Sequence, residues 1–123
     1  MESFKFENLE IWKLACEYVD EIHELIKSFP SDEKFSLIGQ LNRSTSSIPD
    51  NIAEGSGATS VKDFSNYLQT SVKSIYESVS QLYRAWRRGY ITNEQRAYFY
   101  EKAKTLVAKI SAFKQSINKR GRF

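Results

Sequence analysis

Residues 64–86 read FSNYLQTSVKSIYESVSQLYRAW, and one set of apolar and small side chains recurs there at alternating spacings of three and four. This period places the set on one face of a helix that packs at a shallow angle against other helices. The stretch therefore predicts a long helix with one buried face. Its buried positions are Phe64, Leu68, Ser71, Ile75, Val79, Leu82 and Trp86.

Three other segments repeat this pattern, and strand-like alternation is absent from the chain. We therefore expect helices near residues 8–28, 34–54, 61–88 and 93–118 in one domain spanning residues 1–123. Short connections make neighbouring helices antiparallel, so the prediction is an all-α, up-down-up-down four-helix bundle. The three further stripes are Trp12, Ala15, Val19, Ile22 and Ile26; Ile38, Leu41, Thr45, Ile48 and Ile52; and Phe99, Ala103, Leu106, Ile110, Phe113 and Ile117.

Residues that start and stop helices agree with these boundaries. Ser31, Ser60 and Thr92 are the expected N-caps, and Gln95 completes a capping box with Thr92. Gly89 follows two arginines and is a good stop for the third helix. Because proline lacks a backbone donor and clashes with the preceding turn, we expect a kink or break at Pro49.

No pattern for enzyme chemistry or a cofactor is present. His23 is the single histidine, so the Glu-x-x-His pairs of a bundle metal site cannot form, and a solvated surface residue is the better interpretation. Cys16 has no recognisable base or oxyanion hole and is better read as core filler. Gly55-Ser56-Gly57 lacks the ending of a phosphate loop and is read as a flexible connection. We predict no catalytic, cofactor-binding or metal residue.

The expected compartment and the distribution of charge along the chain limit which classes of partner the protein can have. One cysteine and no apolar run of membrane-spanning length favour the cytoplasm over secretion or a membrane. Met1 to Asp63 holds 12 acids and 6 bases, whereas Phe64 to Phe123 holds 3 acids and 12 bases. This asymmetry suggests an anionic partner for the second half, or self-association that pairs the two halves.

The first helix carries a second apolar set beside its core stripe. The extra width suggests burial against another subunit, although a helix with two neighbours in one bundle would bury both faces too. The candidates for an oligomer interface are Ile11, Leu14, Tyr18 and Leu25.

Basic side chains on the third and fourth helices form the second feature beyond a simple bundle. They could neutralise phosphates, while Tyr76 and Tyr83 on the flank of the third helix could stack on unpaired bases. A solvated charged face is the alternative. The nucleic-acid-binding candidates are Lys73, Arg84, Arg87, Arg88, Lys102, Lys109, Lys119, Arg120 and Arg122.

Residues 29–55 carry a family signature. Phe29-Pro30, Gln40, Arg43, Ser47-Ile48-Pro49 and Asn51-Ile52-Ala53-Glu54-Gly55 resemble the four-helix-bundle proteins encoded in intervening sequences of bacterial 23S ribosomal RNA genes. Asn42, Lys73 and Ser78 depart from the usual pattern of that family. The resemblance implies a bacterial cytoplasmic bundle, a homopentameric ring, no enzymatic activity and kinship with nucleic-acid-binding accessory proteins of diversity-generating retroelements.

The polar members of this signature recur at spacings of three and four along the second helix. We expect this polar stripe to bond across a helix or subunit boundary, with a ligand groove as the alternative. Two functions stay open: an oligomeric accessory protein that binds nucleic acid, RNA above all, and an interaction module whose charges serve only assembly. The stripe is Gln40, Arg43, Ser47, Asn51 and Glu54.

Overall fold

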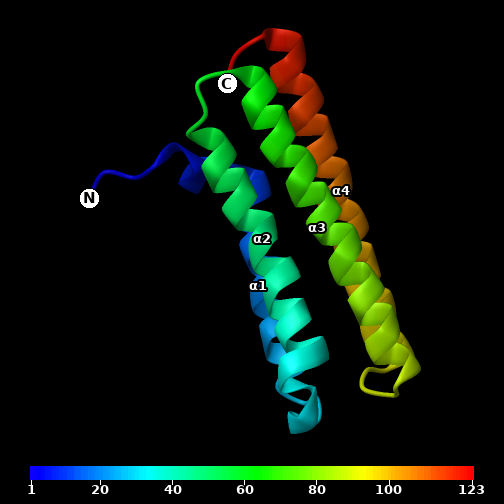
Figure 1. Cartoon of the computed structure of the whole chain (residues 1–123). Coiled ribbons are helices and arrows are strands. Elements are labelled where there is room, and N and C mark those ends of the chain that lie inside the picture. Colours follow the sequence, from blue (N-terminus) through cyan, green and yellow to red (C-terminus); the bar gives the residue numbers. More distant parts are fainter.

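Four long helices follow one another in the computed structural model, which describes residues 1–123 and contains no strand. They are α1 (Glu10–Ile26), α2 (Gly39–Ser56), α3 (Val61–Arg87) and α4 (Asn93–Arg120). Each helix packs against its neighbour in sequence, and α4 returns to α1 (Figure 1). The predicted all-α antiparallel bundle is confirmed. None of its helices is both long and apolar enough to cross a bilayer.

Side-chain caps fix the starts of α3 and α4 as the sequence predicts. The Ser60 hydroxyl accepts a hydrogen bond from the backbone N–H of Asp63 at 3.1 Å. Thr92 and Gln95 form the full capping box, with bonds of 2.8 and 3.0 Å. After α3, Gly89 has a φ of +77°, the left-handed conformation that glycine adopts without strain.

The segment before α2 differs from the prediction. A 3-10 turn over Ser31–Glu33 and a π-helical turn over Lys34–Ile38 precede the α-helix, and the Ser31 side chain caps neither turn. The carboxylate of Glu33 instead accepts hydrogen bonds from Arg88 and Tyr90, beyond the end of α3. These contacts tie the turns to the connection between α3 and α4, which lies at the same end of the bundle.

Pro49 does not break α2, which continues from Gly39 to Ser56. The side of the helix that holds Pro49 is buried against the bundle. Next to it, the Ser71 hydroxyl of α3 donates a hydrogen bond of 2.8 Å to the carbonyl of Ile48. The predicted break is therefore wrong, and the bond from Ser71 holds the backbone of α2 to α3 directly before the proline.

Gly55 lies in the last turn of α2, directly against the first turns of α3. A Cβ on this buried residue would lie 2.6 Å from Cδ1 of Phe64 and 2.8 Å from Cβ of Tyr67. Such distances are shorter than side-chain contacts allow. The interpretation of Gly55-Ser56-Gly57 as a flexible connection is wrong for Gly55, which is the last-turn residue that lets α3 pack against α2.

Candidate nucleic-acid interface

The predicted basic residues lie on several sides of the bundle. Two of them, Lys102 and Lys109, project from α4 toward α1. The Lys102 ammonium is 3.0 Å from Glu21, and the Lys109 ammonium is 2.8 Å from Glu10. The hydrogen bond to Glu21 raises the pKa of Lys102. A carboxylate on α1 therefore offsets each of these charges.

Two other candidates, Arg84 and Arg88, face the α2 side of α3. The Arg84 guanidinium donates a hydrogen bond of 2.6 Å to the side-chain oxygen of Gln40. Arg88 forms its ion pair with Glu33, whose side chain is only 10% exposed. Hydrogen bonds, first from Ser36 and then from Tyr90 and Arg88, lower the pKa of Glu33. Both arginines thus hold α3 to the segment around the start of α2.

Lys73 and Arg87 are exposed on the outer surface of α3 and form no ion pair. Tyr76 and Tyr83 lie between them in sequence at helical spacing, and their exposed fractions are 66% and 42%. A row of cations and aromatic rings therefore follows one face of α3.

Residues of α4 that the sequence analysis missed continue this row. The guanidinium of Arg96 lies 3.9 Å from the ring centre of Trp86 and 5.5 Å from that of Tyr100. Lys104 lies one turn after Tyr100, and its exposed ammonium is 3.6 Å from the carboxylate of Glu101. The signal that could have identified them is the spacing of four residues from Arg96 to Tyr100 and from Tyr100 to Lys104. We call the combined set the α3–α4 face: Lys73, Tyr76, Tyr83, Arg87, Arg96, Tyr100 and Lys104.

An apolar groove opens between the two helices of this face. Its volume is about 420 Å³, and seven of its eight lining residues are hydrophobic. Tyr76 and Val79 contribute from α3, and Tyr100 and Val107 contribute from α4. Lys104 is the one charged residue that lines it.

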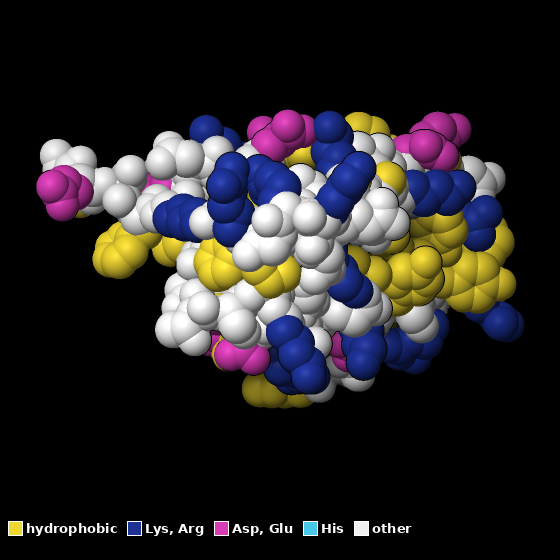
Figure 2. All heavy atoms as spheres, turned by 90° about the horizontal axis from the view of Figure 1, so that it is seen from above, with side chains coloured by type: hydrophobic (Ala, Val, Ile, Leu, Met, Phe, Trp, Pro, Cys, Tyr) yellow, Lys and Arg dark blue, Asp and Glu magenta, His cyan; other side chains and the backbone are white.

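The remaining candidates gather where the chain ends. Lys119 and Arg120 close α4, Arg122 follows, and the antiparallel arrangement brings Lys62 at the start of α3 to the same end. All four are exposed, and none forms an ion pair. Figure 2 looks down on this end and shows Lys and Arg side chains spread across it. We call these four residues the basic end.

Comparison with known proteins identifies the family. The model of the family described as 23S rRNA-intervening sequence protein matches residues 7–112. The chain belongs to this family. A crystal structure from Bacteroides thetaiotaomicron, described as a protein with unknown function from the S23 ribosomal protein family, is similar with a TM-score of 0.78 and 27% identity. The similarity covers 85% of this chain and 95% of that one. No curated protein matches the chain.

The polar stripe that suggested the 23S rRNA-intervening sequence family lies along α2, partly in contact with α3. Gln40 accepts from Arg84, and the Ser47 hydroxyl bonds to that of Ser74 at 2.8 Å. Asn51 bonds back to Ser47 on its own helix. Arg43 and Glu54 are exposed and have no side-chain partner in the single chain. The stripe therefore bonds across a helix boundary at two positions, and its charged members line a shallow polar groove.

The second apolar set of α1 lies mainly inside this family member's own core. Ile11, Tyr18 and Leu25 are 4%, 1% and 9% exposed, because α1 packs against both α2 and α4. As interface candidates these three are wrong, since a second subunit cannot reach buried side chains. Only Leu14 is partly exposed.

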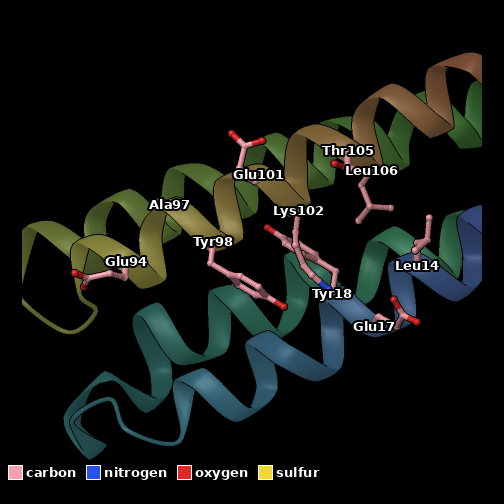
Figure 3. Close-up of a pocket in the computed structure, with 10 residues that line it drawn as sticks. All are labelled: Leu14, Glu17, Tyr18, Glu94, Ala97, Tyr98, Glu101, Lys102, Thr105 and Leu106. Carbon is pink, nitrogen blue, oxygen red and sulfur yellow. The ribbon is translucent and has the colours of Figure 1, made fainter.

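Leu14 lines a cleft of about 620 Å³ between α1 and α4. Figure 3 shows Leu14 and Tyr18 of α1 directed toward α4, with Tyr98 and Leu106 on the opposite side. Carboxylates also line the cleft, and Lys102 is its single base. The α1–α4 side of the molecule is thus apolar and acidic where the α3–α4 face is aromatic and basic. The lining carboxylates are Glu17, Glu94 and Glu101.

The single cysteine and histidine of the chain occupy positions of little chemical reactivity. Burial, followed by the charges of Asp20 and Asp50, raises the pKa of Cys16. The thiol is therefore mainly protonated at neutral pH, whereas a nucleophilic cysteine needs a lowered pKa. His23 is exposed, and no group of three or more His, Cys, Asp and Glu side chains is placed to hold a metal ion.

Proposed function

We propose that this member of the 23S rRNA-intervening sequence family is a cytoplasmic, non-enzymatic accessory protein that binds RNA. The observation that carries the proposal is the α3–α4 face, where exposed tyrosines alternate with cations that have no strong acidic partner. The basic end adds four more exposed cations where α3 begins and α4 ends.

Two physical contributions combine on such a surface. Each Lys or Arg that contacts a phosphate releases counterions, which favours binding in a way that depends strongly on salt. Exposed aromatic rings add stacking on unpaired bases, which depends little on salt or on sequence. Lys73 and Arg87 supply the first contribution next to Tyr76 and Tyr83, which supply the second. Neither contribution requires a catalytic group.

A charge-matched pair of variants tests the proposal. Lys73→Gln with Arg87→Gln removes two charges from the α3–α4 face, and Lys102→Gln with Lys109→Gln removes two that already face carboxylates. Fluorescence anisotropy with a single-stranded RNA is measured over a range of salt concentrations. If each lost contact reduces the salt slope by about 0.7, the first variant has a slope lower by about 1.4.

The second variant keeps most of the wild-type affinity and slope if the proposal is right. Equal losses in both variants would mean that only total charge matters and would contradict an interface on the α3–α4 face. Absence of RNA binding at low salt would refute the proposed function.

Self-assembly is the second candidate function, and the α1–α4 cleft favours it. Its apolar lining and its carboxylates are complementary to a basic surface of another copy, and Leu14 is partly exposed within it. We propose a homo-oligomer, with five copies as the family resemblance implies. Assembly and RNA binding are compatible where the basic end of another copy supplies that basic surface, because the α3–α4 face then stays free for RNA.

Analytical ultracentrifugation detects loss of the oligomer, and thermal unfolding detects loss of stability, so the two together distinguish an assembly defect from a folding defect. Leu14→Glu places a charge in the cleft and should release folded monomers, whereas Leu25→Glu places one in the core and should lower thermal stability instead. A wild-type protein that is already monomeric in dilute solution would contradict the assembly. Loss of the oligomer in the Lys73→Gln, Arg87→Gln variant, together with no RNA binding by the wild type, would support assembly as the sole function.

A further inference from the structure

We propose that the apolar groove between α3 and α4 is a site for one unpaired RNA base. This inference rests on the proposed RNA binding. The base would lie between Tyr76 and Tyr100, with the flanking phosphates near Lys73 and Lys104. This assigns the class of ligand: a flexible single strand or loop, bound without reading its sequence.

The lining of the groove fits the faces of a nucleobase. Seven of the eight lining residues are hydrophobic, and the volume is about 420 Å³. Tyr76 is 66% exposed although its ring borders an apolar space, so a flat partner would cover surface that now faces water. A duplex cannot supply this partner, since its bases are already stacked on each other.

The neighbouring part of the same seam already holds a planar cation by stacking. Arg96 lies 3.9 Å from the ring centre of Trp86 and contacts Tyr100 from one turn before the groove. Tyr100 lines the groove as well. A base in the groove would therefore extend a row of stacked planes that begins with Trp86 and Arg96.

Charge complementarity identifies an anionic strand as the occupant. Lys104 lines the groove, and its only acidic partner, Glu101, is 3.6 Å away and 76% exposed. Such a pair contributes little and is readily replaced by a phosphate contact. Lys73 lies one helical turn before Tyr76 on the exposed surface and forms no ion pair. A phosphate can therefore approach the groove from either helix.

The groove has few groups that could distinguish one base from another. Among its lining side chains, only the hydroxyls of Tyr76 and Tyr100 and the ammonium of Lys104 are polar. Sequence reading needs several donors and acceptors aimed at the base edges. The site therefore accepts any unpaired base and prefers purines to pyrimidines only through their larger stacking surface.

The experiment compares three RNA probes of equal length: an oligoadenylate strand, the same strand with abasic riboses, and a perfect duplex. All are measured by fluorescence anisotropy at one salt concentration. The wild type should bind the oligoadenylate about tenfold or more tightly than the abasic strand, which corresponds to the stacking of one base. The duplex should show no such gain over the abasic strand for an equal number of phosphates contacted.

Ala108→Trp fills the groove without changing any charge, since Ala108 lines it and is exposed. This variant should lose most of the tenfold preference, with stacking on Tyr83 outside the groove giving the remainder, and keep the abasic affinity and the salt slope. Gln115→Trp, an exposed position on the same helix outside the groove, is the matched control and should behave as the wild type. Tyr76→Ala should reproduce the loss, and Tyr76→Phe should not. These two variants test the groove site even if the tryptophan variant fails to fold.

Two results would overturn the groove site while leaving RNA binding intact. One is equal affinity of the wild type for the oligoadenylate and abasic strands. The other is an unchanged preference in both Ala108→Trp and Tyr76→Ala. Failure of every probe to bind at low salt would instead overturn the proposed function itself and the groove site with it.

Discussion

Replacing Gly55 by Ala tests how closely α2 and α3 must pack, and two opposing effects decide the result. Alanine favours a helix interior over glycine by about 1 kcal/mol. The new methyl group, however, would lie 2.6 Å from the ring of Phe64 and 2.8 Å from Cβ of Tyr67. Phe64 is fully buried, and the Cβ of Tyr67 moves only with the backbone of α3.

The clash should exceed the gain in helix propensity. Overpacking a well-packed site costs about 1–3 kcal/mol, so the net loss in the free energy of unfolding is up to about 2 kcal/mol. At roughly 4 °C per kcal/mol for a domain of this size, Tm should fall by several degrees. Thermal unfolding followed by circular dichroism measures this shift.

Gly57→Ala is the matched control. Its Cβ would meet only the Glu54 carbonyl at 3.5 Å, an ordinary contact, and its φ is −89°. Its stability should stay within about 0.5 kcal/mol of the wild type. A Gly55→Ala protein as stable as the wild type, or an equal loss in both variants, would refute the close contact between α2 and α3.

Two further predictions concern buried polar contacts. The hydrogen bonds that Glu33 accepts from Ser36 and Tyr90 lower its pKa, so its stabilising contribution is present above the pKa of the unfolded chain and is lost as pH falls through the folded value. Glu33→Gln should accordingly reduce Tm at neutral pH and flatten the decline of Tm on acidification, and an unchanged acid profile would contradict this. Burial raises the pKa of Tyr18 to about 12, and its hydroxyl bonds to Ser78 at 2.8 Å. Tyr18→Phe should lower the free energy of unfolding by about 1 kcal/mol in urea titrations without changing the oligomeric state, and a stabilised variant would contradict the bond.

The helices were predictable because their evidence is local. Each stripe of apolar residues repeats within one segment, and the caps at Ser60 and Thr92 need only residues three positions away. The start of α2 was not predictable in this way. Glu33 accepts a hydrogen bond from Arg88, 55 residues later, and no local sequence pattern around Glu33 predicts that partner.

The candidate interface was predictable in composition and less so in arrangement. The sequence identified an excess of bases in the second half, but helical periodicity cannot say which neighbour each base meets. Lys102 and Lys109 meet carboxylates on α1, whereas Lys73 and Arg87 stay free. Arg96 was missed because its significance comes from rings on two helices.

The width of the apolar surface on α1 was ambiguous for a geometric reason. A helix that contacts two neighbours in its own bundle and a helix that contacts a second subunit have the same sequence pattern. In the structure, three of the four candidate interface residues lie in the core, and only Leu14 is partly exposed at the α1–α4 cleft.

The order in which the helices pack also determines how the chain can fold. Three of the four helix pairs join neighbours in sequence, so most tertiary contacts close short loops, and such topologies fold within microseconds to milliseconds. The pair α1 and α4 is the exception, since it joins the two ends of the chain across the open cleft. Because closing that loop costs the most chain entropy, α1 should dock onto α4 after the folding barrier. Substitutions at Leu14 should then change the unfolding rate and leave the folding rate nearly constant.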